Sequence, residues 1–376
     1  MSDSYSIAEV QFMREALREA RKGVGRTSPN PCVGAVIVKD DRIIARGYHK
    51  RAGGPHAEIH ALEAAGRAAA DADMYVTLEP CSHTGRTPPC CRAVARSGIK
   101  TVVIGMLDPN PLVDGGGVAY LRARGVSVRH GLLEAECREL NRPFITSVTR
   151  GRPWTVMKAA LTLDGKLTFR RNHADRITGA ETSRKVHRLR DQLDAILVGA
   201  ETVRVDNPSL TTRISGRRGK NPIRVVLDSG LRVPQDARLV AENEDGLTWI
   251  FCSADAEEER VLRFRDAGVT VIPVDPDERG RVDLHRVTAE LGRRQVCSLL
   301  VEGGGAVHGS FLNSRLIDHV MLFYAPIFGG DDGVGLLSGY RVNGGGERAV
   351  RLENMRQGRF GEDLMISGDV VYPSSR

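Results

Sequence analysis

"HAEIHAL" at residues 56–62 and "LEPCSHTGRTPPCC" at residues 78–91 are the stretches that decide the fold of the first part of the chain. The first is Ala-rich without a helix breaker before Gly66, so we expect His56 and Glu58 at the beginning of a helix. The second continues the strand-like run DMYVTLEP and passes into PPCCRAVARSGI, which is typical of a helix. An imidazole, a carboxylate and thiols are thus predicted at the starts of two helices that flank one strand.

The rest of this part of the chain continues the alternation of helix and strand patterns. Apolar residues at helical spacing predict a helix over residues 8–22. Two β-branched runs, CVGAVIV and RIIARGY, stand on either side of Asp40 and Asp41 and predict a hairpin. KTVVIGMLDPNP is typical of a further strand. Segments that alternate in this way predict a sheet covered by helices.

A change of pattern near residue 150 predicts a domain boundary. Prolines, a glycine and polar residues over residues 141–154 interrupt the periodicity, and a new series of strands and helices begins with WTVMKAALTLDGKL. Because the chain exceeds the usual size of one core, we expect two α/β domains, residues 1–149 and 150–376. Later strand-like runs are DAILVGA, IRVVLDS, LTWIFCS, VTVIPV, SLLVEGG and HVMLFYAPIF.

The composition is typical of a globular protein without a disulfide framework. Apolar residues make up 41% of the chain and charged residues 27%, and no apolar run approaches the roughly 18 residues of a membrane span. Seven cysteines are an odd number, and they lie at scattered positions. The first residues lack a signal-peptide pattern, so we expect a cytoplasmic protein with no membrane partner.

The net charge of +7 favours small anionic ligands such as phosphates over nucleic acid. Arginines are spread along the chain without a basic block, and aromatic residues, which stack on bases, are only 5% of the total. We therefore expect a small phosphorylated substrate and no nucleic-acid partner.

The His, Glu and Cys residues of the two opening stretches match the needs of a hydrolytic zinc site. Such a site uses three protein ligands and an open fourth position, where a bound water can lose a proton near neutral pH. His56, Cys81 and either Cys90 or Cys91 supply one imidazole and two thiolates. Glu58 is near enough to move a proton without binding metal, as in the H-x-E…P-C-x-x-C pattern of zinc nucleobase deaminases. The alternative is a core histidine with inert cysteines.

An eight-residue insert, SHTGRTPP, separates Cys81 from the second cysteine. It contains His83, Arg86 and Thr87, whose donors suit a phosphate or a ribose. An enzyme acting on a free base would not need them, so we interpret these residues as substrate contacts.

The segments TSPNPCVGAVIVKDDRIIARGYH, PHAEIHAL, TLEPCSHTGRTPPCC and DPNPLV closely resemble the deaminase domain of the bifunctional riboflavin-biosynthesis deaminase/reductase family. The resemblance implies a cytidine-deaminase-like α/β/α domain that binds zinc through His56, Cys81 and Cys90. It also implies that Glu58 is the catalytic acid and base and that Asn30 contacts the pyrimidine.

The second domain resembles the reductase domain of the same family, which is similar to dihydrofolate reductase in fold and uses NADPH. MKAALTLDGKL, the central segment ITGAETSRKVHRLRDQLDAILVGAETVRVDNPSLTTR, VVLDSGLRVP and VEGGGAVHGSFL carry this resemblance. It implies that Lys158 and Asp206 act in catalysis. The implied cofactor-side positions are Ala160, Thr202, Asp206, Ser229, Gly304, Gly305, Ala306, Val307, His308, Gly309 and Ser310. The implied substrate-side positions are Arg190, Leu210, Arg213 and Glu302.

The resemblance implies two reactions in what we expect to be a homo-oligomer. The first is zinc-dependent hydrolytic deamination of 2,5-diamino-6-(5-phosphoribosylamino)pyrimidin-4(3H)-one, and the second is NADPH-dependent reduction of the ribosyl chain to ribityl. Arg190 and Arg213 are suited to grip the substrate's 5′-phosphate, because the guanidinium group can bind it through two hydrogen bonds. The chain departs from the family at Arg176, where a tryptophan is usual, and at Thr162, where serine is common.

Three other functions remain as alternatives. One is a deaminase of related specificity in another pathway whose second domain is degenerate around Arg176. Another is a deaminase of bases in nucleic acid, which the low aromatic content disfavours. The third is a non-catalytic protein stabilised by zinc, which would normally close the metal site with a fourth protein ligand.

Overall fold

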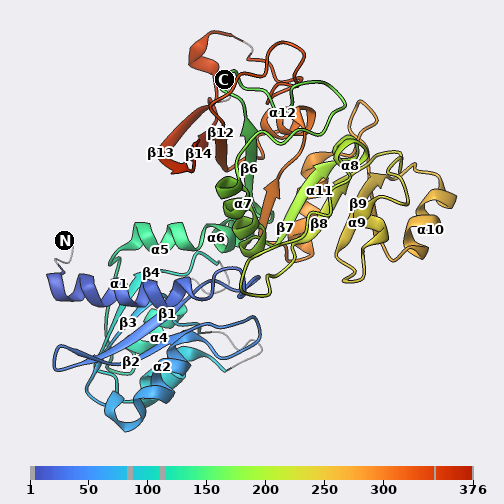
Figure 1. Cartoon of the computed structure of the whole chain (residues 1–376). Coiled ribbons are helices and arrows are strands. Elements are labelled where there is room, and N and C mark those ends of the chain that lie inside the picture. Colours follow the sequence, from blue (N-terminus) through green and yellow to red (C-terminus); the bar gives the residue numbers. More distant parts are fainter. Residues whose placement is uncertain (1–4, 83–87, 111–114, 343, 375–376) are drawn as a thin grey trace. The chain divides into compact units, whose positions relative to one another are not determined.

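The computed structural model describes residues 5–82, 88–110, 115–342 and 344–374. The chain divides into two compact units, Met1–Gly151 and Arg152–Arg376, called the first and second unit below (Figure 1). Both units combine a β-sheet with helices, so the expected α/β class is confirmed. Within the described ranges, no helix has both the length and the hydrophobicity needed to cross a bilayer.

The first unit is a five-stranded sheet between two layers of helices. The strand order is β2-β1-β3-β4-β5; β1 is antiparallel to both of its neighbours, and β3, β4 and β5 are parallel. Helices α1 and α5 lie against one face, and α2 and α4 lie against the other (Figure 1). The elements are α1 (Ile7–Arg21), β1 (Gly34–Lys39), β2 (Arg42–Tyr48), α2 (Ala57–Ala65), a 3-10 turn (Gly66–Ala69), β3 (Asp73–Leu78), α3 (Cys90–Arg96), β4 (Thr101–Met106), α4 (Gly116–Arg122), β5 (Ser127–His130), α5 (Glu134–Leu140) and α6 (Arg142–Arg150).

Local sequence signals set the first helix and the hairpin where they were predicted. A capping box begins α1, because the Ser6 hydroxyl accepts from the Glu9 N–H and the Glu9 carboxylate accepts from the Ser6 N–H. Asp40 and Asp41 have φ angles of 50° and 55°, the left-handed pair that a two-residue hairpin requires. The β1–β2 hairpin is therefore confirmed.

Gly47 brings α2 close to the sheet. A Cβ atom at this position would lie 2.3 Å from the Ala57 carbonyl oxygen and 2.5 Å from the Ala61 nitrogen, both in α2. Only glycine permits this approach, since atoms of a rigid helix backbone cannot move aside. The start of α2 is fixed against β2 as a result, and with it the position of His56, which is the N-cap of α2.

The second unit is built on a nine-stranded sheet of order β10-β9-β8-β7-β11-β6-β12-β14-β13. The first seven strands in this order are parallel, and β14 and β13 form an antiparallel extension. One apolar core joins the sheet to α7, α8, α9 and α10, and a second core joins it to α11 and α12. The elements are β6 (Trp154–Leu161), α7 (Ala180–Gln192), β7 (Ala195–Gly199), α8 (Ala200–Asp206), β8 (Ile223–Leu227), α9 (Arg238–Ala241), β9 (Thr248–Ser253), α10 (Glu258–Asp266), β10 (Thr270–Val274), α11 (Leu284–Arg293), β11 (Ser298–Val301), α12 (Gly305–Asn313), β12 (His319–Tyr324), a 3-10 turn (Gly346–Arg348), β13 (Arg351–Phe360) and β14 (Asp363–Val371).

Most of the segment 141–154, which interrupts the apolar periodicity, is helix α6, and this helix was not predicted. Pro143 lies in the first turn of α6, where a missing N–H removes no helical hydrogen bond. Gly151 ends the helix with a φ angle of 65°. The residues that disturb the apolar periodicity are therefore the start and stop signals of a short helix.

Replacing Gly47 with alanine should destabilise the first unit by about 1–3 kcal/mol, because the new methyl group overlaps the backbone of α2. Both tryptophans, Trp154 and Trp249, belong to the second unit, so their fluorescence reports that unit alone. In urea titrations, G47A should move the circular-dichroism transition and leave the fluorescence transition in place. R46A, at an exposed position of the same strand, is the control. A G47A curve that matches R46A would contradict the steric argument.

Candidate functional site

The structure brings the side chains of His56, Cys81 and Cys90 to one point. The Nδ1 atom of His56 lies 3.1 Å from the Cys90 sulfur and 3.6 Å from the Cys81 sulfur. All three potential ligand atoms lie within 4.8 Å of one another. His56 precedes α2, Cys90 begins α3, and Cys81 follows β3, so two helix starts and one strand end meet here.

This donor set fits a zinc ion. With Zn–S bonds of about 2.3 Å and Zn–N bonds of about 2.0 Å, tetrahedral ligand atoms stand roughly 3.5 Å apart, close to the spacing observed. Hydrogen bonds from Cys90 and then from His56 lower the pKa of the Cys81 thiol to about 4, despite its burial. A thiol that ionises so readily is a good metal ligand.

Glu58 lies beside these three groups, and one of its carboxyl oxygens has no partner among the described residues. Its side chain is buried, with 3% exposure, and its Oε2 atom has no hydrogen-bond partner among the described residues. Burial raises the pKa of this carboxyl to about 7. A carboxyl group in this environment can hold or release a proton near neutral pH, as a general acid and base must.

The two adjacent cysteines have different surroundings. The Cys90 sulfur contacts His56, whereas Cys91 belongs to the apolar core of the first unit. The backbone N–H of Cys91 donates to the Cys81 carbonyl at 3.2 Å and holds the start of α3 beside the strand end. The geometry therefore favours Cys90 over Cys91 as the third ligand.

Asn30 is held in a defined orientation by His49, a residue that sequence reasoning did not single out. The His49 Nδ1 atom is 3.0 Å from the carbonyl oxygen of Pro55, which can only accept, so Nδ1 carries the proton. The Nε2 atom must then accept from Nδ2 of Asn30, at 3.1 Å. This leaves Oδ1 of Asn30 as the end that can accept from a ligand. The His49 ring also lies edge-on to the His56 ring at 5.1 Å.

The loops around this centre are anchored by a second buried group, Glu79. Its carboxylate accepts from the N–H of Val118 at 3.0 Å and from the N–H of Asp108 at 3.3 Å. Its place between a strand and the Pro-Cys pair is the signal that could have identified it. His83, Arg86 and Thr87, predicted as substrate contacts, lie outside the described residues.

In the second unit, several predicted cofactor-side positions gather at the carboxyl ends of adjacent parallel strands. Thr202 follows β7, Ser229 follows β8 and Gly304 follows β11. A Cβ atom at Gly304 would lie 3.6 Å from the Thr202 hydroxyl. Such strand ends, followed directly by helix starts, are a common place for ligands in parallel sheets. Ala160, near the end of β6, is partly buried.

The residues at the glycine-rich start of α12 differ in how deeply they are buried. Gly305 and Gly309 are buried against the segment around Ser338, and Ala306 is exposed. His308 is buried, with 1% exposure, and neither ring nitrogen has a hydrogen-bond partner among the described residues. Burial lowers its pKa to about 4, so the ring is neutral. The remaining predicted positions in this stretch, Val307 and Ser310, are partly buried.

Lys158, Arg190 and Glu302 form a largely buried ionic cluster. Glu302 accepts from Arg190 at 3.0 Å and lies 3.8 Å from the Lys158 nitrogen, and all three side chains are at most 14% exposed. Burial alone would raise the pKa of Glu302, but the charges of Arg190 and Lys158 lower it to about 2. Burial lowers the pKa of Lys158, although Glu302 partly opposes this. Sequence reasoning named all three residues but did not predict that they pair.

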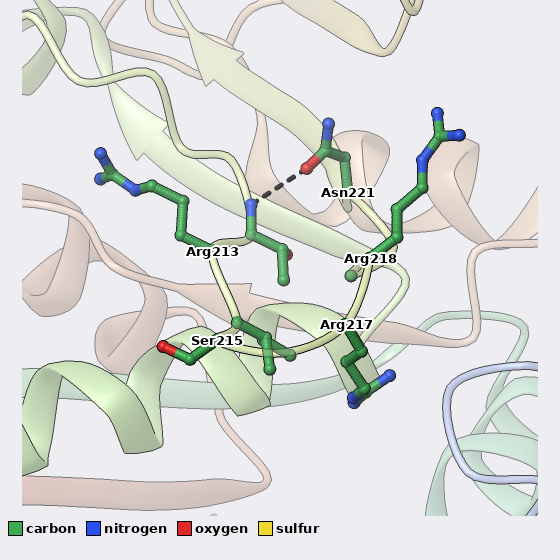
Figure 2. Close-up of a pocket in the computed structure, with 8 residues that line it drawn as sticks. Arg213, Ser215, Arg217, Arg218 and Asn221 are labelled. Carbon is green, nitrogen blue, oxygen red and sulfur yellow. Dashed lines mark hydrogen bonds between the residues drawn. The ribbon is translucent and has the colours of Figure 1, made fainter.

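Arg213 lies on a different feature, the loop around an open pocket of about 540 Å³. Figure 2 shows that Arg213, Arg217 and Arg218 point in different directions from this loop. Arg217 pairs with the buried Asp191. The predicted phosphate grip by Arg190 and Arg213 therefore stays a prediction, since Arg190 is engaged by Glu302 and the guanidinium groups on this loop do not converge.

The remaining predicted positions lie close to these groups in sequence. Asp206 ends α8, and its pKa is raised by partial burial and by the negative charge of Asp175. Leu210 is buried, with a φ angle of 50°. Arg176, at the departure from the family pattern, is exposed and donates to the Thr178 carbonyl at 3.3 Å.

Comparisons with known proteins agree with the division of the chain into two units. Residues 7–106 match the cytidine and deoxycytidylate deaminase zinc-binding region, and residues 153–366 match the RibD C-terminal domain. Riboflavin biosynthesis protein RibD of Bacillus amyloliquefaciens is 41% identical, with 97% of this chain and 99% of that protein covered.

Two solved structures are similar over almost the whole chain. Acinetobacter baumannii RibD matches with a TM-score of 0.88 and 31% identity, covering 97% of this chain and 99% of the other. A diaminohydroxyphosphoribosylaminopyrimidine deaminase/5-amino-6-(5-phosphoribosylamino)uracil reductase from Thermotoga maritima matches with a TM-score of 0.84 and 38% identity, covering 98% and 99%. Identity of this extent, over both domains, shows that the chain belongs to the RibD family of bifunctional riboflavin-biosynthesis enzymes, with an N-terminal zinc-binding deaminase domain and a C-terminal reductase domain.

Proposed function

We propose that the chain acts on 2,5-diamino-6-(5-phosphoribosylamino)pyrimidin-4(3H)-one, first replacing its 2-amino group by oxygen and then reducing its ribosyl chain to ribityl with NADPH. The observation that carries the proposal is the convergence of His56, Cys81 and Cys90 beside the buried carboxyl group of Glu58. The name of the relative from Thermotoga maritima supports the choice of substrate. We assign the deaminase to residues 1–149 and the reductase to residues 150–376.

In the deaminase, His56 Nδ1 and the sulfurs of Cys81 and Cys90 would bind the metal. Zinc, when bound, would lower the pKa of a water at its fourth coordination position. Glu58 would accept a proton from the attacking water at its carboxylate and deliver it to the departing amino group, so that water is consumed and ammonia leaves. Asn30 accepts a hydrogen bond from the pyrimidine through Oδ1, and His49 holds it in that orientation.

In the reductase, NADPH would supply a hydride to C1′ of the opened sugar. Thr202, Ser229 and the start of α12 would bind the cofactor at the carboxyl ends of the strands. Lys158, whose pKa is lowered by burial, and Asp206 are the groups that can deliver a proton to the atom next to the reduced carbon. Glu302 keeps Lys158 in place through their ion pair.

The metal ligands are tested by zinc content. H56A, C81S and C90S should each reduce bound zinc from about one ion per chain to near zero, because a catalytic zinc site rarely tolerates loss of one of its three protein ligands. C91A changes the neighbouring thiol, which faces the core, and should retain zinc. Metal analysis of the purified variants checks this. Zinc retention in C90S with loss in C91A would reverse the assignment of the third ligand.

Glu58→Gln should abolish ammonia release, by at least about 100-fold in kcat, because an amide cannot accept and return the proton. Zinc content and NADPH-dependent reduction of the deaminated substrate should match the unmodified enzyme, since Glu58 is neither a ligand nor part of the second unit. Normal ammonia release by E58Q would remove the proposed deaminase mechanism. Loss of reduction together with deamination would contradict the assignment of the two reactions to separate sites.

Asp206→Asn should lower the rate of NADPH oxidation by about 100-fold, the usual contribution of a positioned acid or base. Deamination should not change. E201Q is the matched control, because Glu201 is an exposed carboxylate on the same helix that pairs only with Arg204 in the described structure. If D206N and E201Q oxidise NADPH equally fast, Asp206 has no role in the reduction.

A further inference from the structure

Asn141 binds the backbone of the loop that carries Asn30. The Cys32 N–H donates to Oδ1 of Asn141 at 2.8 Å, and Nδ2 of Asn141 donates to the Cys32 carbonyl at 3.1 Å. One side-chain amide thus bonds both backbone polar groups of Cys32, which precedes β1. Asn141 is buried, with 2% exposure, where such a pair of hydrogen bonds is protected from water.

Asn141 is itself fixed at the junction of α5 and α6. Its Nδ2 atom also donates to the Cys137 carbonyl at 3.3 Å, and its own carbonyl accepts from the Ile145 N–H at 2.9 Å. Cys137 is fully buried, and a Cβ atom at Gly105 of β4 would lie 2.4 Å from its sulfur. The absence of a side chain at Gly105 therefore lets α5 pack closely on the sheet, and Asn141 has a fixed position relative to β4.

The loop from residue 27 to residue 33 also makes contacts of its own, including one between the Thr27 hydroxyl and the Cys32 sulfur at 3.3 Å. The Asn30 N–H donates to the Thr27 carbonyl at 2.8 Å, and the Val33 carbonyl accepts from the His49 N–H at 2.9 Å. Between these two points, Asn141 bonds both backbone polar groups of Cys32, two residues from Asn30. A small movement of Cys32 would shift the Asn30 amide from His49, since the bond between them is a single contact at 3.1 Å.

We propose that Asn141 is a positioning residue of the deaminase, which acts through Cys32 to hold Asn30 against His49, beside the metal ligand His56. The inference rests on the proposed role of Asn30 as the residue that accepts from the pyrimidine. A residue between two helices, outside the catalytic motifs, would thus help to orient the substrate.

The test is Asn141→Asp in the full-length, zinc-loaded enzyme. Aspartate keeps the size and the acceptor that faces the Cys32 N–H, but it places an oxygen against the carbonyls of Cys32 and Cys137. Because the loop loses one anchor and gains repulsion, the KM for deamination should rise about tenfold, with kcat within about threefold of the unmodified enzyme. Zinc content and NADPH-dependent reduction should not change. T149A, an exposed position on α6, should leave all four quantities unchanged.

The double variant N30A/N141D separates this inference from the proposed function. If Asn141 acts through Asn30, its substitution should add little to the KM of N30A. An additive effect, an unchanged KM in N141D, or a fall in kcat with loss of zinc would overturn the inference and leave the role of Asn30 standing. If N30A itself deaminates normally, the role of Asn30 fails and the inference fails with it.

A measurement on the unmodified protein serves if N141D does not fold. Residues 29 and 31 are prolines, so the amide hydrogens of a peptide covering 29–33 are those of Asn30, Cys32 and Val33. Hydrogen exchange at Cys32 should be as slow as in β1, because its N–H is bonded to a buried amide. Exchange as fast as in an exposed loop would overturn the inference.

Discussion

The first unit depends on bringing one imidazole and two thiols to a single point. Two of these groups stand at helix starts and one follows a strand end. The starts of α2 and α3 and the end of β3 must therefore lie close together. Gly47 permits this for α2 by removing the side chain that would push the helix away. The Cys91 N–H does so for α3 by bonding the carbonyl of Cys81. The metal centre is therefore a consequence of backbone packing, and the ligands need no long side chains to reach each other.

Much of this could be predicted because the signals are local. The turn at Asp40 and Asp41 follows from their tolerance of left-handed backbone, and the position of His56 at a helix start follows from an uninterrupted Ala-rich run. The ligand set follows from residue types at a known spacing. In each case the physical cause lies within a few residues of the effect, so one sequence is enough.

The features that were not predicted depend on partners distant in the sequence. Nothing near His49 in the sequence indicates that it orients Asn30, 19 residues away, and nothing near Asn141 indicates a bond to Cys32, 109 residues away. In the same way, Arg190 was predicted to grip a phosphate, whereas its strongest contact is with Glu302, which is 112 residues further on. Helix α6 was not predicted for another reason, because the prolines, glycine and polar residues of the segment 141–154 interrupt the apolar periodicity that indicates a helix.

The two reactions need different access of water and different charge states of a carboxyl group. This difference explains why one chain has two separate sites. Deamination consumes water, so its centre needs a coordination position open to solvent and an acid that holds its proton by burial. Hydride transfer must avoid water, and the second unit provides a cluster of Lys158, Arg190 and Glu302 whose charges neutralise one another while largely buried. A carboxylate kept ionised by two cations could not serve as the proton carrier that Glu58 is suited to be. The two reactions therefore require incompatible surroundings for the same functional group, and separate folding units supply them.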